Sequence, residues 1–122
     1  MQSKIIAFDL DDVLCYRTSE EGDVEKYFSC KPMTKMIDIV NKCYDKGHKI
    51  IIYTARGATS FNSNIPDIYS NLFMITSEQL KTWNVKYHQL VFGKIHYDVL
   101  IDDKAVNSLE INDVESVEKW LK

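Results

Sequence analysis

Short apolar runs alternate along the chain with stretches that are apolar on one side only. Four of these runs are almost continuously apolar, at residues 4–8, 49–53, 89–92 and 99–101. Runs of this length without alternation are typical of parallel strands that are buried on both faces. We therefore expect four strands at these positions.

The stretches between and after these runs predict helices. Apolar residues recur at steps of three and four after Pro32 and stop before Gly47, which predicts one helix. A second helix is expected across 76–83, with a pattern that extends back toward residue 65, and Thr76 and Gln79 have the spacing of a capping box. A third helix is expected over 114–121. Residues 57–64 are rich in Gly, Ser and Asn and predict a loop.

This order of elements predicts an α/β fold with a single domain over residues 1–122. Strands that alternate with helices form a mostly parallel sheet, and apolar strands of this kind need helices on both faces. The expected architecture is a Rossmann-like three-layer sandwich. Ligands of such sheets bind beyond the carboxyl ends of the strands, so polar residues at those ends are candidates for chemistry.

Polar residues cluster at three of the four predicted strand ends. They are Asp9 and Asp11 after the first strand, Thr54 and Arg56 after the second, and Asp102 and Asp103 after the fourth. Clustered carboxylates repel one another unless a cation neutralises them, and Mg²⁺ prefers carboxylate oxygens together with a substrate phosphate. If the second and fourth strands flank the first, all these groups converge on one crevice.

Composition and charge exclude several other classes of protein. The net charge is -3 with a pI of about 5.6, so no general attraction to nucleic acid is expected. No apolar run is long enough for a membrane span, and we expect no signal peptide before the first strand. Cys15, Cys30 and Cys43 form no C-x-x-C pair, which favours reduced thiols in a cytoplasmic protein.

Four short motifs make the chain resemble the haloacid dehalogenase (HAD) superfamily. They are FDLDDVLC at residues 8–15, YTAR at 53–56, FGK at 92–94 and LIDDKA at 100–105. Their order and spacing match over essentially the whole chain, and the combination is most similar to small phosphatases of capsular polysaccharide biosynthesis. The resemblance implies a HAD-like phosphatase core.

The resemblance also implies a role for each motif residue. Asp9 would be the nucleophile, Asp11 the general acid/base, and Thr54 and Lys94 would hold the phosphate. Asp9, Asp11, Asp103 and Asp102 would surround Mg²⁺. Asp11 would bind it through its backbone carbonyl, Asp103 is the usual direct ligand of such a pair, and Asp102 would orient a metal-bound water. Lys104 directly follows this pair and competes with Lys94 as the motif lysine. Asp12 stands where Gly or Asn is commoner, and we assign it no catalytic role.

Two arginines are candidates for substrate binding. Arg56 is a planar donor beside the predicted phosphate site, and Arg17 lies in the excursion after the first motif. The spans after Cys15 and after Thr54 are too short for an inserted cap domain, so the site is expected to be open. A second copy of the chain, in a homo-oligomer, would then be the source of a lid.

The sequence thus predicts a magnesium-dependent phosphomonoester hydrolase that works through an aspartyl-phosphate. The expected substrate is a phosphorylated sugar or small polyol of surface-glycan biosynthesis, with neither nucleic acid nor membrane as a partner. Two alternatives remain. One is a nucleic-acid-end phosphatase with the same chemistry, which the acidic pI disfavours. The other is a phospho-accepting receiver domain, which the absence of an aspartate after the run at 89–92 disfavours.

Overall fold

The computed structural model describes residues 2–121 and contains a parallel sheet of three strands. The strands are β1 (Ile5–Phe8), β4 (Lys49–Thr54) and β5 (Gln89–Phe92), in the order β1-β4-β5. In register, Ile6 lies beside Ile50, and Thr54 beside Phe92. The α/β class and the parallel sheet are therefore confirmed, and the arrangement is compatible with a small Rossmann-like fold.

Three helices accompany the sheet. They are α1 (Thr34–Asp45), α2 (Ile65–Thr82) and α3 (Val114–Glu118), close to the positions that periodicity predicts. The cap of α2 is Asn64, whose side chain accepts a bond from the Asp67 backbone N–H. The capping box expected at Thr76 and Gln79 is wrong, because both residues lie inside α2. None of these helices combines the length and apolar character needed to cross a bilayer.

A two-stranded antiparallel ribbon follows the first motif. It pairs β2 (Cys15–Tyr16) with β3 (Lys31–Pro32), and the 3₁₀ turn η1 (Glu25–Tyr27) lies between them. We call residues 17–30 the flap. The Thr18 hydroxyl donates to the Ser29 carbonyl at 3.0 Å and ties the two ends of the flap together.

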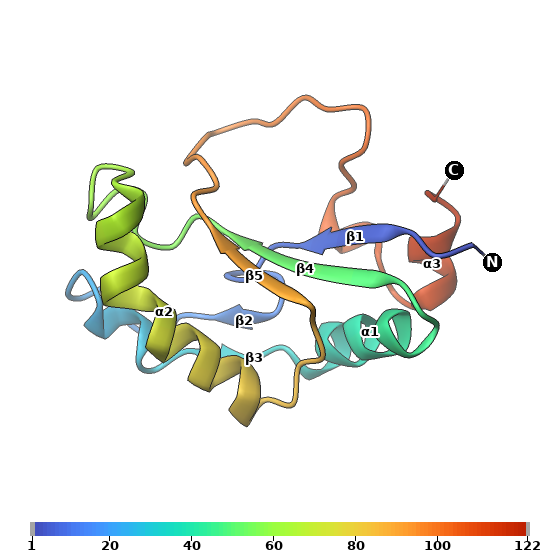
Figure 1. Ribbon diagram of the computed structural model, residues 1–122, viewed down its shortest axis with the longest axis horizontal. Coiled ribbons are helices and arrows are strands. Elements are labelled where there is room, and N and C mark those ends of the chain that lie inside the picture. Colours follow the sequence, from blue (N-terminus) through green and yellow to red (C-terminus); the bar gives the residue numbers. More distant parts are fainter. Residues whose placement is uncertain (1, 122) are drawn as a thin grey trace.

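The core lies on one face of the sheet. Side chains of β1 and β4 that point to this face share one apolar cluster with residues of all three helices, including Ile6, Phe8, Ile50, Val40, Leu80 and Val117. A smaller cluster joins Phe92 of β5 to α2 and the flap. Figure 1 shows α1 and α2 on the same side of the three strands. Both helices therefore pack on the same face of the sheet.

The other face of the sheet is covered less than the sequence predicts. Ile5 is 68% exposed and Tyr53 38% exposed, and burial along β1 alternates residue by residue. The apolar runs predict helices on both faces of the sheet. This prediction fails for the second face because an apolar side chain looks the same in sequence whether or not a helix covers it.

The expected fourth strand is also absent from the part of the chain that the structure describes. Residues 93–107 form no helix or strand, and they leave β5 as a long arch that returns toward α3 (Figure 1). Val99 is 74% exposed and Ile101 93% exposed. The prediction is wrong here because an apolar run records strand preference and says nothing about a pairing partner. A second 3₁₀ turn, η2 (Ser108–Glu110), precedes α3.

Candidate active site

Six of the eight candidate residues line one cavity of about 490 Å³ at the carboxyl ends of the strands. These six are Asp9, Asp11, Arg17, Thr54, Arg56 and Lys94. Parallel strands end at a common edge of the sheet, which explains why residues far apart in sequence meet there. Flap residues and the stretch after β5 complete the walls.

Asp9 and Lys94 form the central pair of the cavity. Lys94 Nζ lies 3.3 Å from Asp9 Oδ2, and the Lys94 backbone N–H donates to the Thr54 carbonyl. Gly93 adopts a φ of 102°, and a Cβ there would meet Ile65 at 2.8 Å, so the turn that delivers Lys94 requires glycine. Lys104 does not line the cavity, and its backbone N–H bonds the carboxylate of Asp102. Of these two lysines, Lys94 is therefore the one that lies in the cavity.

Burial dominates the electrostatics of this pair. It raises the pKa of Asp9 above its ordinary value, although the N–H of Leu10 and the charge of Lys94 act in the opposite direction. Burial alone would lower the pKa of Lys94, but Asp9 and Tyr97 together outweigh it and the net shift is upward. Asp9 is therefore a carboxylate whose charge the surroundings do not fully compensate.

Residues 9–14, which we call the first loop, connect β1 to β2 and are held in shape by backbone hydrogen bonds. The Leu10 carbonyl accepts bonds from the N–H groups of Val13, Leu14 and Cys15, while Leu10 and Leu14 are fully buried. Asp12 takes a φ of 68°, in the left-handed region. This tight loop turns Asp9 and Asp11 toward the same cavity.

Asp11 is held by Arg56 instead of standing free. Arg56 Nε donates to Asp11 Oδ2 at 2.9 Å, and its NH2 group donates to Asp11 Oδ1 at 3.0 Å. This is the two-pronged geometry in which a guanidinium binds a carboxylate most strongly. Proton transfer by Asp11 therefore requires this pair to open first.

Arg56 does not match its predicted role in substrate binding. The residue is only 2% exposed, and its NH1 group donates to the Thr76 hydroxyl at 3.0 Å and to Gln79 Oε1 at 2.7 Å. Its guanidinium is thus occupied by Asp11 and by α2, which makes it a positioning residue. Thr54 also faces inward: its hydroxyl accepts the Arg56 backbone N–H and retains a proton to donate.

Asp102 and Asp103 do not reach the cavity. Both are exposed, and neither lines it, because the arch that carries them does not pair with β1. The predicted ring of four carboxylates is therefore not assembled in this structure. Arg17 of the flap does line the cavity, and its side chain is 27% exposed.

Several residues of the site were not predicted from the sequence. Tyr27, Thr76 and Gln79 all contact Arg56, and Cys15 and Cys30 place their sulfurs 3.5 and 3.6 Å from its NH2 group. Tyr27 and Cys30 come from the flap, Cys15 from β2, and Thr76 and Gln79 from α2, so no spacing in the sequence could reveal that they meet.

Two sets of residues offer ligand atoms for a metal ion. Asp11, Cys15 and Cys30 bring their ligand atoms within 4.8 Å of one another. Sulfur is a poor ligand for Mg²⁺, and the Arg56 cation already occupies this position, so the set does not suit magnesium. Asp9 and Asp12 both line the cavity, and Mg²⁺ commonly needs only one or two carboxylates with water and phosphate. By donor chemistry, these two carboxylates suit a hard cation better than the set of Asp11, Cys15 and Cys30 does.

Comparison with known proteins supports the fold and names no activity. No family model matches the chain, and no curated protein matches it significantly. The chain is similar to the crystal structure of a structural genomics target from Vibrio cholerae, with 26% sequence identity and a TM-score of 0.80. The match covers 96% of this chain and 95% of the other.

Proposed function

We propose that the protein is a magnesium-dependent phosphomonoester hydrolase of the HAD type. The observation that carries the proposal is the Asp9–Lys94 pair at 3.3 Å, with Thr54 beside it, at the carboxyl ends of three parallel strands. A nucleophile, a cation and a hydroxyl donor in one cavity are the parts that phosphoryl transfer needs. The four sequence motifs support the same assignment.

The chemistry follows from the residues of the cavity. An Asp9 oxygen attacks phosphorus, the bond from phosphorus to the ester oxygen breaks, and an aspartyl-phosphate forms. Water then attacks this intermediate, releases inorganic phosphate and restores Asp9. Lys94 and the Thr54 hydroxyl hold the phosphoryl oxygens, where negative charge concentrates in the transition state.

Asp11 is the candidate for proton transfer to the leaving oxygen. Its two bonds to Arg56 must loosen for this step, so substrate entry and rearrangement of this pair are coupled in the proposal. A bound Mg²⁺, held by Asp9 with Asp12 beside it, would neutralise charge between the carboxylates and the phosphate.

The substrate class rests on the size of the cavity and on the motifs. A volume of about 490 Å³ lies within the range of small-molecule sites, which suits a phosphorylated sugar or polyol of surface-glycan synthesis. The cavity is open, and a second copy of the chain is a natural source of a lid. The three free thiols are consistent with a reducing cytoplasm.

Hydrolysis of phenyl phosphate, measured with and without Mg²⁺, tests the proposal directly. Removing metal with a chelator should lower turnover roughly hundredfold or more, and added Mg²⁺ should restore it. Asp9→Asn should abolish turnover while the circular dichroism spectrum stays native, with deamidation excluded by mass spectrometry. Asp38→Asn, a surface change on α1, is the matched control. Full activity in chelator, or near-normal turnover by Asp9→Asn, would refute the mechanism.

A further inference from the structure

Three cations surround the ring of Tyr27 in the flap. The Arg56, Lys26 and Arg17 cationic groups lie 4.6, 5.3 and 5.7 Å from its centroid, and all three residues line the cavity. An aromatic face attracts cations, but three like charges around one ring also repel one another. The arrangement therefore calls for anionic partners.

The anionic partners within the described chain are too few. Arg56 has Asp11, which binds it through two bonds. Arg17 has Glu20 at 3.3 Å, but the Glu20 side chain is 73% exposed, and a pair so open to water contributes little. Lys26 forms no ion pair with any carboxylate of residues 2–121. Among the described residues, Lys26 thus has no ion-pair partner, and Arg17 has only a partner that is largely exposed to water.

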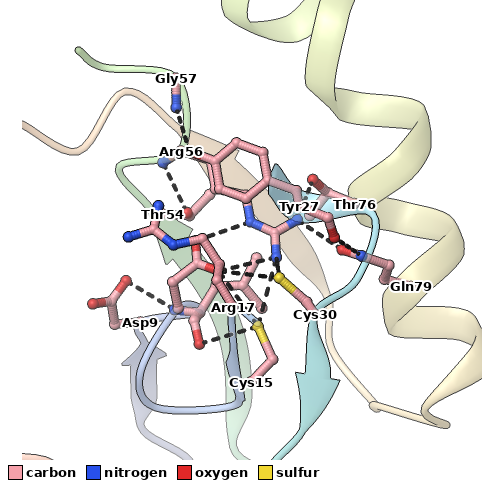
Figure 2. Close-up of polar contacts among 12 residues, drawn as sticks. Asp9, Cys15, Arg17, Tyr27, Cys30, Thr54, Arg56, Gly57, Thr76 and Gln79 are labelled. Atoms are coloured by element: carbon pink, nitrogen blue, oxygen red, sulfur yellow. Dashed lines mark hydrogen bonds and ion pairs between the residues drawn. The ribbon is translucent and has the colours of Figure 1, made fainter. Parts of the chain in front are cut away.

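The flap holds this charge in a defined place. Tyr27 is 3% exposed, its hydroxyl accepts the Gly57 N–H, and its carbonyl accepts the amide of Gln79 on α2. Pairing of Tyr16 with Lys31 brings the start of the flap back beside its end, so Arg17 reaches the same ring (Figure 2). Arg17 and Lys26 are therefore positioned by contact with the buried, hydrogen-bonded ring of Tyr27.

We propose that Arg17 and Lys26 form a second anion subsite, and that the natural substrate carries a carboxylate or a second phosphate besides its phosphoryl ester. This inference rests on the proposed function, which assigns the ester phosphate to Asp9, Lys94 and Thr54. The second anionic group displaces Glu20 from Arg17 and gives Lys26 a partner. Arg17 and Lys26 then select among phosphate esters, a task that the open walls perform poorly.

Matched pairs of sugar phosphates test the subsite by kinetics. One pair is glucose 6-phosphate and 6-phosphogluconate, which adds a carboxylate; the other is fructose 6-phosphate and fructose 1,6-bisphosphate, which adds a phosphate. At least one doubly anionic member should have a kcat/KM about tenfold above that of its partner, because bonds to charged groups are worth about this factor. The pair that shows the preference identifies the second group.

Charge-removing variants locate the subsite. Lys26→Gln and Arg17→Gln should each reduce the preference at least threefold, mainly through a higher KM for the doubly anionic substrate. Lys31→Gln removes an exposed lysine of β3 outside the cavity and should keep the wild-type preference. Equal kcat/KM within both pairs, or a preference that survives in both flap variants, would overturn the subsite.

Binding to Asp9→Asn separates this inference from the proposed function. Calorimetric titration of that variant should give a Kd for a doubly anionic compound about tenfold below that of its singly anionic partner. In the double variant Asp9→Asn/Lys26→Gln, the two Kd values should become equal. If no phosphate ester is hydrolysed by the wild type, the hydrolase proposal fails, but this affinity difference still supports the second anion subsite. Equal affinities would overturn the subsite whatever the activity.

Discussion

At the scale of single residues, Asp9 carries its charge in surroundings that disfavour it. Burial raises its pKa despite the neighbouring Lys94, so the folded protein keeps the Asp9 proton to a higher pH than the unfolded chain. As pH rises past the ordinary value of 3.8, the unfolded state loses this proton first and gains stability relative to the folded state. This loss in the free energy of unfolding stops growing once the pH exceeds the raised pKa.

Asp9→Asn should therefore stabilise the metal-free protein in a pH-dependent way. Its free energy of unfolding, relative to the wild type, should increase as pH rises from about 3.8 through the raised pKa and then level off. Urea unfolding between pH 4 and pH 7 measures this difference. A difference that stays constant or shrinks with rising pH would contradict the assignment, and Asp38→Asn again provides the surface control.

Asp12 is the residue of the first loop whose backbone adopts an unfavourable conformation. Its φ of 68° lies in the left-handed region, where a Cβ is unfavourable and where Asp, Asn and Gly are tolerated best. This conformation suits aspartate, asparagine and glycine alike, which explains why an aspartate is tolerated here.

Asp12→Ala should lower the free energy of unfolding by about 1 kcal/mol, because alanine has no polar side chain to support the left-handed turn. Asp12→Gly and Asp12→Asn should stay within roughly 0.5 kcal/mol of the wild type. Thermal or urea unfolding without metal compares the three variants. Equal stability of the alanine and glycine variants would show that the loop relaxes out of this conformation.

At the scale of elements, Arg56 joins three segments that the sequence keeps apart. Its guanidinium contacts Asp11 of the first loop, Thr76 and Gln79 of α2, and the Tyr27 ring of the flap. Burial alone would lower the Arg56 pKa, but the bonds to Asp11 outweigh it. The loops of the candidate site are thus assembled around one buried cation.

Arg56→Lys should cost about 3 kcal/mol of stability, although the charge is kept. A lysine cannot reproduce the paired bonds to Asp11 and also reach Thr76 and Gln79. Urea unfolding gives the loss, and hydrogen exchange should show faster exchange in the flap and the first loop. Arg17→Lys, at a partly exposed position, should lose less than about 1 kcal/mol. A mild effect of Arg56→Lys would mean that the network is dispensable.

Element prediction from the sequence succeeded where a local pattern decides the structure. Apolar runs predict β1, β4 and β5, and helical periodicity predicts α1 and α2. Prediction failed where the structure depends on a contact with a distant segment. Residues 99–101 have strand character but pair with no described strand. Thr76 and Gln79 have capping-box spacing, but they bind the buried Arg56 instead of starting a helix. Local preference does not specify which segments meet.

At the scale of the whole molecule, some parts of the site follow from local sequence patterns, and others depend on contacts between distant segments. Residues that follow β1, β4 and β5 could be predicted because strand ends of a parallel sheet must converge. The flap contacts and the Asp11–Arg56 pair could not, since they depend on how the chain returns over the cavity. Asp102 and Asp103 were misplaced because their position depended on the missing fourth strand.

The thinly covered face of the sheet has a thermodynamic consequence. Heat capacity rises on unfolding because apolar surface enters water, and an average domain gains about 12–15 cal/mol/K per residue, or roughly 1.5–1.8 kcal/mol/K for a chain of this length. Ile5 and Tyr53 already face solvent in the folded chain, as do Val99 and Ile101, and so add little to that change.

Calorimetry of the monomer at several pH values should therefore give a heat-capacity change below roughly 1.5 kcal/mol/K. A value at or above the average would mean that this surface is buried in solution, for example by a second copy, and the midpoint would then depend on protein concentration. A small heat-capacity change flattens the curve of unfolding free energy against temperature. The protein should then keep a nearly constant, modest stability over a wide range of temperature, without the sharp optimum of a fully covered domain.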